Sequence, residues 1–220
     1  MIKKLLIFLL PWSLKRRLLK FCYGYDIHPT AHIGFSWIFP SKLIMKEGAK
    51  IGHLNVGINL DCMRLGMKSS INRGNWITGY STLHPTQHFA HQKDRVSELD
   101  LGDYSAITKN HHLDCTHKIK IGKFSTLAGY QSQFLTHSID VFNCRQHSAP
   151  ITIGDYTFIG TNVVMLGNST LPSFCVLGAK SLLNKTFKEE WFVYAGNPAK
   201  PVKTISSDAK YFSRLEGFIV

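Results

Sequence analysis

Apolar side chains return every sixth residue through the second half of the chain. Four residues after each of them, the same period brings a small or β-branched side chain. The aliphatic positions are Ile153, Ile159, Met165, Leu171, Leu177 and Leu183, and the small ones are Thr157, Val163, Ser169, Cys175 and Ser181. A period of six fits neither an α-helix, which repeats at about 3.6 residues, nor a strand, which repeats at about 2. It is typical of hexapeptide repeats, in which three hexads form one triangular coil of short parallel strands.

The same period begins less regularly near Ile27. Several hexads there open with an aliphatic residue followed by glycine, as at Ile33, Ile51 and Leu65. Two runs then keep steps of six, and Ile121 re-enters the period after a slip of two residues: Leu65, Ile71, Ile77 and Leu83, then Leu101, Ile107 and Leu113. Coils stacked about 4.8 Å apart would bury these side chains on one another. We therefore predict an all-β fold, a parallel β-helix over residues 25–203.

Two segments interrupt the period, at about residues 85–100 and 135–150. Insertions in a solenoid form loops on one face and commonly carry function. Beyond the coils, Asn197-Pro198 and Pro201 block regular strand pairing. The pattern over residues 206–218 is helical, with Ser206 or Ser207 as the N-cap. We therefore expect a C-terminal helical tail over residues 204–220.

Residues 1–24 form a basic amphipathic segment in which Lys3-Lys4 precedes a six-residue apolar run and Lys15-Arg16-Arg17 follows Trp12. The run is too short to span a bilayer, which needs roughly 20 apolar residues. A short h-region with no small-x-small cleavage site after it also argues against a signal peptide. Two interpretations of a short amphipathic helix in residues 1–22 stay open. It lies on an anionic membrane surface, or it packs on the rest of the molecule.

The net charge limits the classes of binding partner, and the cysteine content indicates the cellular compartment. The chain has 26 Lys and Arg against 14 Asp and Glu, a formal net charge of +12. This favours an anionic membrane, an acidic glycan or a polyphosphorylated cofactor. No helix-turn-helix, zinc-finger or RNA-binding motif occurs in the sequence, so we do not expect nucleic acid. The five cysteines include no CxxC pair, which favours a reducing compartment, hence the cytoplasm, and no structural zinc site.

Four runs of sequence carry a family resemblance: residues 136–140, with His137 at their centre, 151–162, 177–181 and 194–203, which includes Ala-Gly-Asn-Pro-Ala-Lys. Together they resemble the hexapeptide-repeat O-acetyltransferases, closest to the sugar and polysaccharide enzymes of lipopolysaccharide, capsule and exopolysaccharide. The resemblance implies a left-handed β-helix, an exception to the right-handed crossover rule. It also implies a homotrimer with active sites between neighbouring prisms, acetyl-CoA as acyl donor and no metal.

The reaction implied by the resemblance is acetyl transfer to a sugar hydroxyl, with His137 at the family position of the general base. Histidine exchanges protons near neutral pH. It can therefore take the hydroxyl proton and return it to the departing CoA thiolate, without an acyl-enzyme. Asp140 has two interpretations: it orients this imidazole, or it forms a turn.

The resemblance also assigns residues to the two substrates. Contacts to acetyl-CoA are expected from Thr161, Ala179, Asn184, Lys185, Lys200 and Lys203. The last two lysines suit the CoA phosphates, although solvated surface charges are the alternative. The acceptor candidates are Asn110, His112 and Asp114. They stand where the small-sugar enzymes have an Asn-aromatic-Asn element, so we expect a larger glycan or a lipid-linked sugar at the inner face of the cytoplasmic membrane.

Three other functions compete with this one. An antibiotic acetyltransferase of the streptogramin or chloramphenicol type shares the loop histidine and the fold, but usually lacks a basic N-terminal segment. A zinc enzyme of the carbonic-anhydrase kind would bring histidines from facing prisms. Its candidate ligands here are His111, His112, Cys115 and His117. A catalytically silent scaffold would need neither His137 nor the C-terminal run that resembles the CoA-binding sequence.

Overall fold

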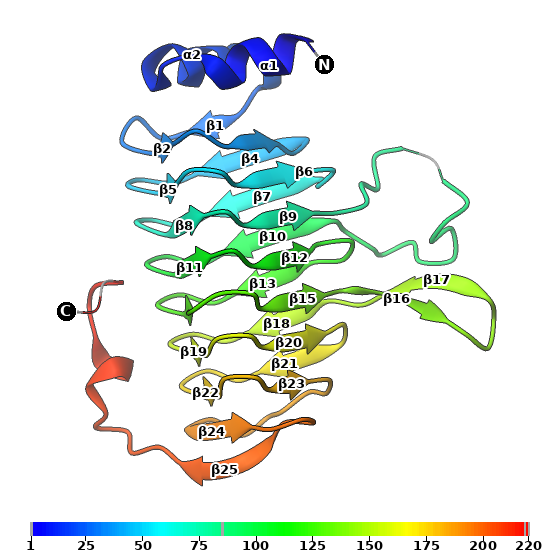
Figure 1. Ribbon diagram of the computed structural model, residues 1–220, viewed down its shortest axis with the longest axis vertical. Helices are drawn as coiled ribbons and strands as arrows, with labels where there is room; N and C mark the ends of the chain where they lie inside the picture. The colour runs from blue at the N-terminus through cyan, green and yellow to red at the C-terminus, as the bar shows by residue number, and fades with distance from the viewer. Residues whose placement is uncertain (1, 85, 218, 220) are drawn as a thin grey trace.

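The chain winds into a triangular prism of stacked coils, with two helices lying across one end (Figure 1). The computed structural model describes residues 2–84, 86–217 and 219. In Figure 1 the coils descend from the N-terminal end. The nearer strands β6, β9 and β12 point to the right and the farther strands β7, β10 and β13 to the left. A chain that turns this way as it descends is left-handed, so the predicted left-handed parallel β-helix is confirmed.

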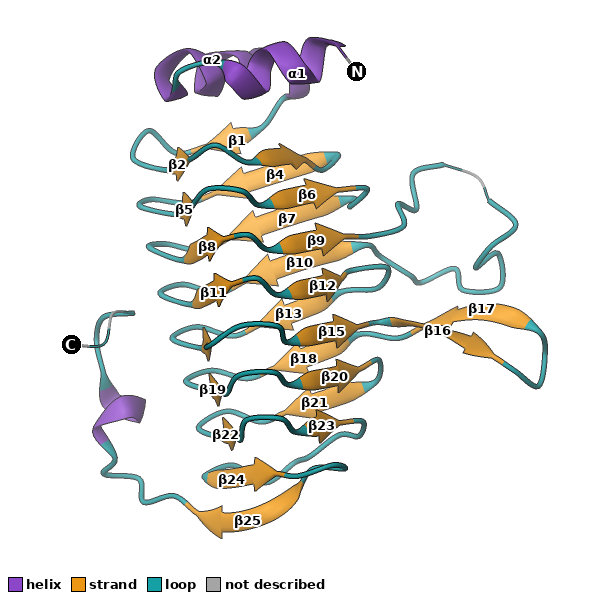
Figure 2. Ribbon diagram, in the orientation of Figure 1, coloured by secondary structure: helices purple, strands orange, loops and turns teal. Residues whose placement is uncertain are grey.

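Three sheets form the faces of the prism, and within each coil the chain visits them in turn (Figure 2). The first sheet contains β1 (Asp26–Ile27), β4 (Lys42–Met45), β7 (Cys62–Leu65), β10 (Glu98–Leu101), β13 (Ile119–Ile121), β18 (Ile151–Ile153) and β21 (Ser169–Leu171). The second contains β2 (His32–Ile33), β5 (Lys50–Ile51), β8 (Ser70–Arg73), β11 (Ala106–Lys109), β14 (Thr126–Leu127), β19 (Phe158–Ile159), β22 (Val176–Leu177), β24 (Phe192–Ala195) and β25 (Lys200–Thr204). The third contains β3 (Trp37–Phe39), β6 (Val56–Ile58), β9 (Trp76–Thr78), β12 (His112–Asp114), β15 (Gln133–Leu135), β20 (Val164–Leu166) and β23 (Leu182–Leu183).

The aliphatic sixfold positions fill the inside of the prism. In the second sheet Ile107, Leu127, Ile159 and Leu177 follow one another in parallel register. All six aliphatic positions predicted between residues 153 and 183 are buried. Because each coil places these side chains on the equivalent side chains of the next, one continuous apolar column forms without helical crossovers.

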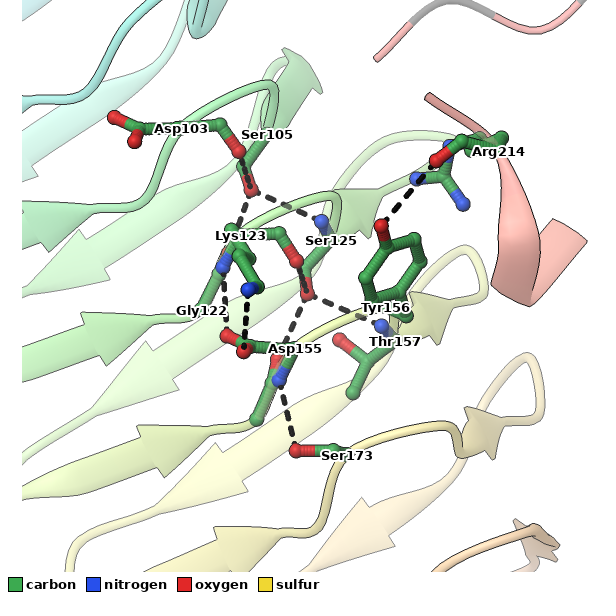
Figure 3. A network of polar contacts seen from close by, with 11 residues as sticks. Asp103, Ser105, Gly122, Lys123, Ser125, Asp155, Tyr156, Thr157, Ser173 and Arg214 are labelled. Carbon is green, nitrogen blue, oxygen red and sulfur yellow. Dashed lines mark hydrogen bonds and ion pairs between the residues drawn. The ribbon is translucent and has the colours of Figure 1, made fainter. Parts of the chain in front are cut away.

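Serines at the second sixfold position of two neighbouring coils connect one coil to the next. Figure 3 shows this at the corner between the first and second sheets. The Ser105 hydroxyl donates to the Gly122 carbonyl at 2.6 Å and accepts the Ser125 N–H at 2.9 Å. The Ser125 hydroxyl in turn donates to the Gly154 carbonyl at 2.8 Å and accepts the Thr157 N–H at 3.1 Å. Short polar side chains are needed here because a buried backbone N–H without a partner is costly.

This same corner carries a stack of aromatic rings, one per coil, with centroids 4.5 to 5.6 Å apart: Tyr104, Phe124, Tyr156, Phe174 and Trp191. We call it the aromatic corner. The C-terminal tail lies over it. Arg214 stands 5.7 Å from the ring centroid of Tyr156, and Phe212 contacts Trp191 edge-on at 5.4 Å.

The predicted C-terminal helix over residues 206–218 is wrong for the part of the tail that the structure describes. The strand β25 runs antiparallel to β24, and a single 3-10 turn, η1 (Lys210–Ser213), follows it. Ser206 caps no helix; its hydroxyl bonds the Asp208 carboxylate. The tail is drawn out because Tyr211, Phe212 and Arg214 each contact the aromatic corner or its backbone.

The N-terminal segment forms two helices instead of the single one expected, α1 (Ile2–Leu9) and α2 (Trp12–Tyr23). Pro11, which lacks an N–H, lies between them. Ile7 and Leu19 are buried against the end of the prism, so the packing interpretation holds for one side of this segment. Among the residues described, no helix combines the length and the apolar character needed to cross a bilayer.

Both interruptions of the repeat leave the prism at the corner between the third and first sheets, which we call the loop corner, and both project to the same side (Figure 1). The first occupies residues 79–97 and starts earlier than predicted, because Leu83 is exposed and takes no place in a coil. The second is an antiparallel hairpin of β16 (His137–Asp140) and β17 (Arg145–Ser148).

Candidate active site

His137 stands at the base of this hairpin, on the loop corner. Its strand begins directly after the third sheet, and its backbone pairs with Ser148 on the return strand. The backbone N–H donates to the Asp114 carboxylate at 3.3 Å, which ties the hairpin to the coil before it. The imidazole is exposed, and one side of it meets the ring of Phe89 edge-on at 5.5 Å. Both interruptions of the repeat therefore contribute to the surroundings of this side chain.

Gln146 binds the other end of the imidazole. Its side-chain carbonyl is hydrogen-bonded to Nε2 of His137. A carbonyl oxygen can only accept, so Nε2 carries the proton and Nδ1 keeps its lone pair. In this tautomer Nδ1 is the ring nitrogen that can accept a proton.

The first interruption is fastened to the hairpin by one glutamine. The Gln92 side chain donates to the Ser148 carbonyl at 2.7 Å and accepts the Ser148 N–H at 3.0 Å. The side-chain amide of Gln92 therefore pairs with β17 in the way that the backbone of a neighbouring strand would. Beneath it, Arg95 donates to the Thr116 carbonyl at 2.7 Å and lies 4.6 Å from the Phe89 ring. These contacts fix Phe89 beside His137.

Asp61 closes the neck of the first interruption. Its carboxylate accepts hydrogen bonds from Ser81, Thr82 and the Ser97 N–H, which lie at the two ends of the segment. Partial burial raises the pKa of this carboxyl, but these hydrogen bonds outweigh burial and hold the pKa below its ordinary value. The Asp61 carboxylate therefore holds the two ends of the first interruption together.

Asp140 lies apart from the imidazole, and the structure supports its other interpretation, that of a turn residue. It accepts the Asn143 side chain at 2.7 Å and Arg145 Nε at 3.2 Å. The Asn143 hydrogen bond is the main cause of a lowered Asp140 pKa. Side chains alternate along a strand, so residues 137 and 140 face opposite sides of the hairpin.

The three acceptor candidates divide between two places. Asp114 lies under the hairpin, where its carboxylate accepts the N–H groups of His137 and Thr116. His112, on the same strand, also faces outward. It lines an open groove of about 590 Å³ on the third sheet together with Asn110, Trp76, Gln133 and Val164.

The expected cofactor residues do not converge within one chain. Thr161 and Ala179 occupy consecutive turns between the second and third sheets, which we call the narrow corner. A Cβ on Gly160 there would lie 2.7 Å from the Ala179 nitrogen, so the coils meet without room for a side chain. Asn184 and Lys185 lie at the loop corner of the last complete coil, whereas Lys200 and Lys203 are exposed on β25.

Two of the four candidate zinc ligands are buried and cannot bind a shared metal. His111 is buried: its Nδ1 accepts the Ser132 N–H at 3.1 Å, its Nε2 bonds Thr108 at 3.0 Å, and burial lowers its pKa to about 4. Cys115 is buried in the core. Neither can reach a metal shared with a facing prism. Among the residues that the structure describes, no group of three or more His, Cys, Asp or Glu side chains is placed to hold a metal.

Sequence reasoning missed Phe89, Gln92 and Gln146. The hairpin could have been predicted locally, because the turn-forming residues Asp140 and Asn143 lie between two four-residue segments. Nothing near Gln92 in the sequence indicates its role, because its partner Ser148 lies 56 residues away.

Comparison with solved structures confirms the fold. A mutant of AntD, an N-acyltransferase from Bacillus cereus in complex with dTDP-4-amino-4,6-dideoxyglucose and coenzyme A, matches 90% of this chain and 92% of its own, with 13% identity and a TM-score of 0.57. The polySia-specific acetyltransferase NeuO matches 84% of this chain and 85% of its own, with 18% identity and a TM-score of 0.53. No protein-family model and no curated protein sequence matches the chain. The chain therefore shares the hexapeptide-repeat fold of these transferases at low sequence identity.

Proposed function

We propose that this protein is an acetyl-CoA-dependent O-acetyltransferase that acts on a hydroxyl of a sugar in a glycan or polysaccharide precursor. The observation that carries the proposal is the setting of His137. It is exposed at the base of the hairpin, with Phe89 beside it and Gln146 holding its Nε2 proton. A histidine kept in one tautomer by a neutral partner is suited to general-base catalysis. The similarity in fold to NeuO and AntD supports the same class of reaction.

In the proposed reaction, the acceptor hydroxyl gives its proton to Nδ1 of His137 while its oxygen attacks the thioester carbonyl carbon. Collapse of the tetrahedral intermediate breaks the carbon–sulfur bond. The imidazolium returns its proton to the CoA thiolate, so the products are the acetyl ester and free CoA. Gln146 keeps its hydrogen bond to Nε2 throughout, since that nitrogen is protonated in both states of the ring.

We further propose that the active enzyme is a homotrimer. Thr161 and Ala179 lie at the narrow corner, whereas His137 lies at the loop corner. The third sheet separates these two corners within one prism. A site that uses both therefore needs the narrow corner of a neighbouring copy, and a closed ring of three gives three such sites. Lys200 and Lys203 are exposed on β25 and would supply positive charge for the CoA phosphates.

The acceptor we infer is a large or lipid-linked glycan at the inner face of the cytoplasmic membrane. Phe89 of the first interruption lies beside His137, and the open groove lined by Asn110 and His112 lies on the third sheet. An extended oligosaccharide suits an open groove better than a small free sugar, which is usually enclosed.

The decisive experiment is a CoA-release assay with His137→Ala and the wild type, each supplied with glycan fractions from a host that lacks the protein. We expect turnover to fall about 10²- to 10⁴-fold in the variant, the usual contribution of a general base. Near-normal transfer by His137→Ala would overturn the mechanism. Acetylation of chloramphenicol or a streptogramin, with no glycan modified, would overturn the acceptor class.

A further inference from the structure

The two N-terminal helices present an open apolar face on the side away from the prism. In α1 this face consists of Ile2, Leu5, Leu6 and Leu9, all exposed. Their spacing of three and four residues places them on one side of the helix. Ile7, on the opposite side, is buried. The helix is therefore apolar on two sides, and the prism covers one of them.

The second helix continues this surface. Leu14, Arg17 and Phe21 share one face of α2 at helical spacing, with Lys20 beside them, and all four are exposed. The Phe21 ring is 88% exposed, which is unusual for an ordered helical phenylalanine. Lys15 and Leu19 face the prism.

The inward side holds both helices firmly. The Phe8 ring packs on Phe35 at 4.1 Å, and Trp12 on His32 at 5.2 Å. The Lys15 ammonium donates to the backbone carbonyls of Gly34 at 3.2 Å and Ser36 at 3.4 Å, in the first coil of the prism. The outward face is thus a fixed surface on the end of the prism rather than a loose arm.

The charge of this segment identifies the occupant of the face. Residues 1–25 contain six basic residues and no Asp or Glu: Lys3, Lys4, Lys15, Arg16, Arg17 and Lys20. Lys15 faces the prism, so the cations available to lipid phosphates are the other five. Apolar side chains that enter the headgroup boundary, flanked by such cations, fit an anionic bilayer. A second copy of the chain would bring the same positive charge against itself, which opposes an end-to-end dimer.

We propose that the outward face of α1 and α2 docks on an anionic phospholipid bilayer, with the long axis of the prism along the membrane normal. Figure 1 shows the helices lying across the end of the prism, which sets this orientation. β15 is the fifth strand of the third sheet from that end, and it leads into His137. Four coil steps and one helix diameter separate His137 from the lipid, about 30 Å. If the proposed function holds, the acceptor hydroxyl lies at that height, on a glycan that projects from the membrane.

The docking can be tested without any acyl transfer. The full chain is floated with vesicles of phosphatidylcholine alone and of phosphatidylcholine with phosphatidylglycerol. We expect binding to the anionic vesicles only, and weaker binding at about 1 M salt, where the screening length falls to about 3 Å. The double variant Leu6→Asp/Phe21→Asp should bind the anionic vesicles at least about tenfold more weakly, since it replaces apolar contacts with charge. Arg17→Glu/Lys20→Glu should lose the preference for anionic lipid.

The matched control is Phe142→Asp, which alters an exposed phenylalanine at the hairpin tip and should bind like the wild type. Thermal unfolding shows whether each variant keeps its fold. Failure of the wild type to bind anionic vesicles would overturn the proposal, as would undiminished binding by Leu6→Asp/Phe21→Asp. An assembly larger than a trimer in the absence of lipid, abolished by this double variant, would assign the face to a second copy instead.

Discussion

The side-chain carbonyl of Gln146 accepts a hydrogen bond from Nε2 of His137 across the two strands of the hairpin. In register, His137 faces Ser148 and Gln146 faces Ile139, so the two side chains meet diagonally. This contact leaves Nδ1 as the basic nitrogen. In the proposed mechanism Gln146 therefore takes the positioning role that the sequence suggested for Asp140.

Replacing Gln146 by leucine should lower kcat about fivefold, the usual consequence of losing one hydrogen bond of about 1 kcal/mol. KM for acetyl-CoA should change little, because the residue touches His137 rather than the cofactor-binding residues. Gln146→Glu keeps an oxygen acceptor and should restore most of the activity. It should also displace the acid limb of the pH–rate profile to higher pH, since a carboxylate favours the protonated imidazole.

Asp140→Asn is the matched control, because asparagine keeps an oxygen in the hairpin turn. Its kcat should stay within about twofold of the wild type, as expected for a surface residue that supports a turn. A larger loss in Asp140→Asn than in Gln146→Leu, with both variants folded, would return the orienting role to Asp140.

The prism itself could be predicted because its rule is local and repeated. Each sixth residue packs on its own equivalent in the next coil, so Ile159 and Leu177 lie one above the other and both are buried. A pattern of this kind requires no knowledge of distant contacts. At Ser105 and Ser125 the second sixfold position has an equally local role, because each hydroxyl bonds the backbone of the next coil.

The site was predictable only in part, because the loops that form it obey no such period. The apolar side chains Ile139 and Phe142 of the hairpin are both exposed, so its sequence shows no core-facing apolar alternation. Phe89 and Gln92 reach the hairpin through contacts with residues about fifty positions later in the chain. The tail was mispredicted for a similar reason. Tyr211 and Arg214 contact coils far away in sequence, and these contacts override a helical pattern.

Mixing two inactive variants should restore activity if sites form between copies. His137→Ala lacks the base but keeps the narrow corner, and Ala179→Arg blocks that corner but keeps the base. Random trimers of equal amounts would contain both intact parts at about one quarter of their sites. We therefore expect about a quarter of wild-type turnover after co-refolding, measured by CoA release. A mixture as inactive as its components would place the whole site within one chain.

Acid should weaken the fold through His111. Burial lowers its folded pKa to about 4 from the ordinary 6.5, and its partners Thr108, Ser132 and Asn75 are uncharged. Between these values the unfolded chain holds the extra proton, so the free energy of unfolding falls as pH falls from 6.5 to 4. The loss approaches about 3 kcal/mol for a single group.

His111→Asn should remove this acid sensitivity while preserving the hydrogen-bonded column, because Asn75 occupies the same position one coil earlier and accepts the His111 N–H at 3.0 Å. Urea unfolding at pH 7 and at pH 5 gives the comparison. The difference between wild type and variant should change by about 2 kcal/mol over this interval, as one proton requires. Parallel pH dependences of the two proteins would show that His111 contributes no such linkage.

Lys15 should make the stability of the fold depend on pH in the alkaline range. It caps the first coil through the carbonyls of Gly34 and Ser36, and burial lowers its pKa from 10.5 to about 8. The folded chain gives up this proton before the unfolded chain does, so the free energy of unfolding rises as pH goes from 8 to 10.5. Lys15→Met, of similar length and uncharged, should lack that rise when unfolding is followed by urea at pH 7.5 and 9.5. An equal rise in both proteins would mean that the ammonium of Lys15 is not held in the buried cap.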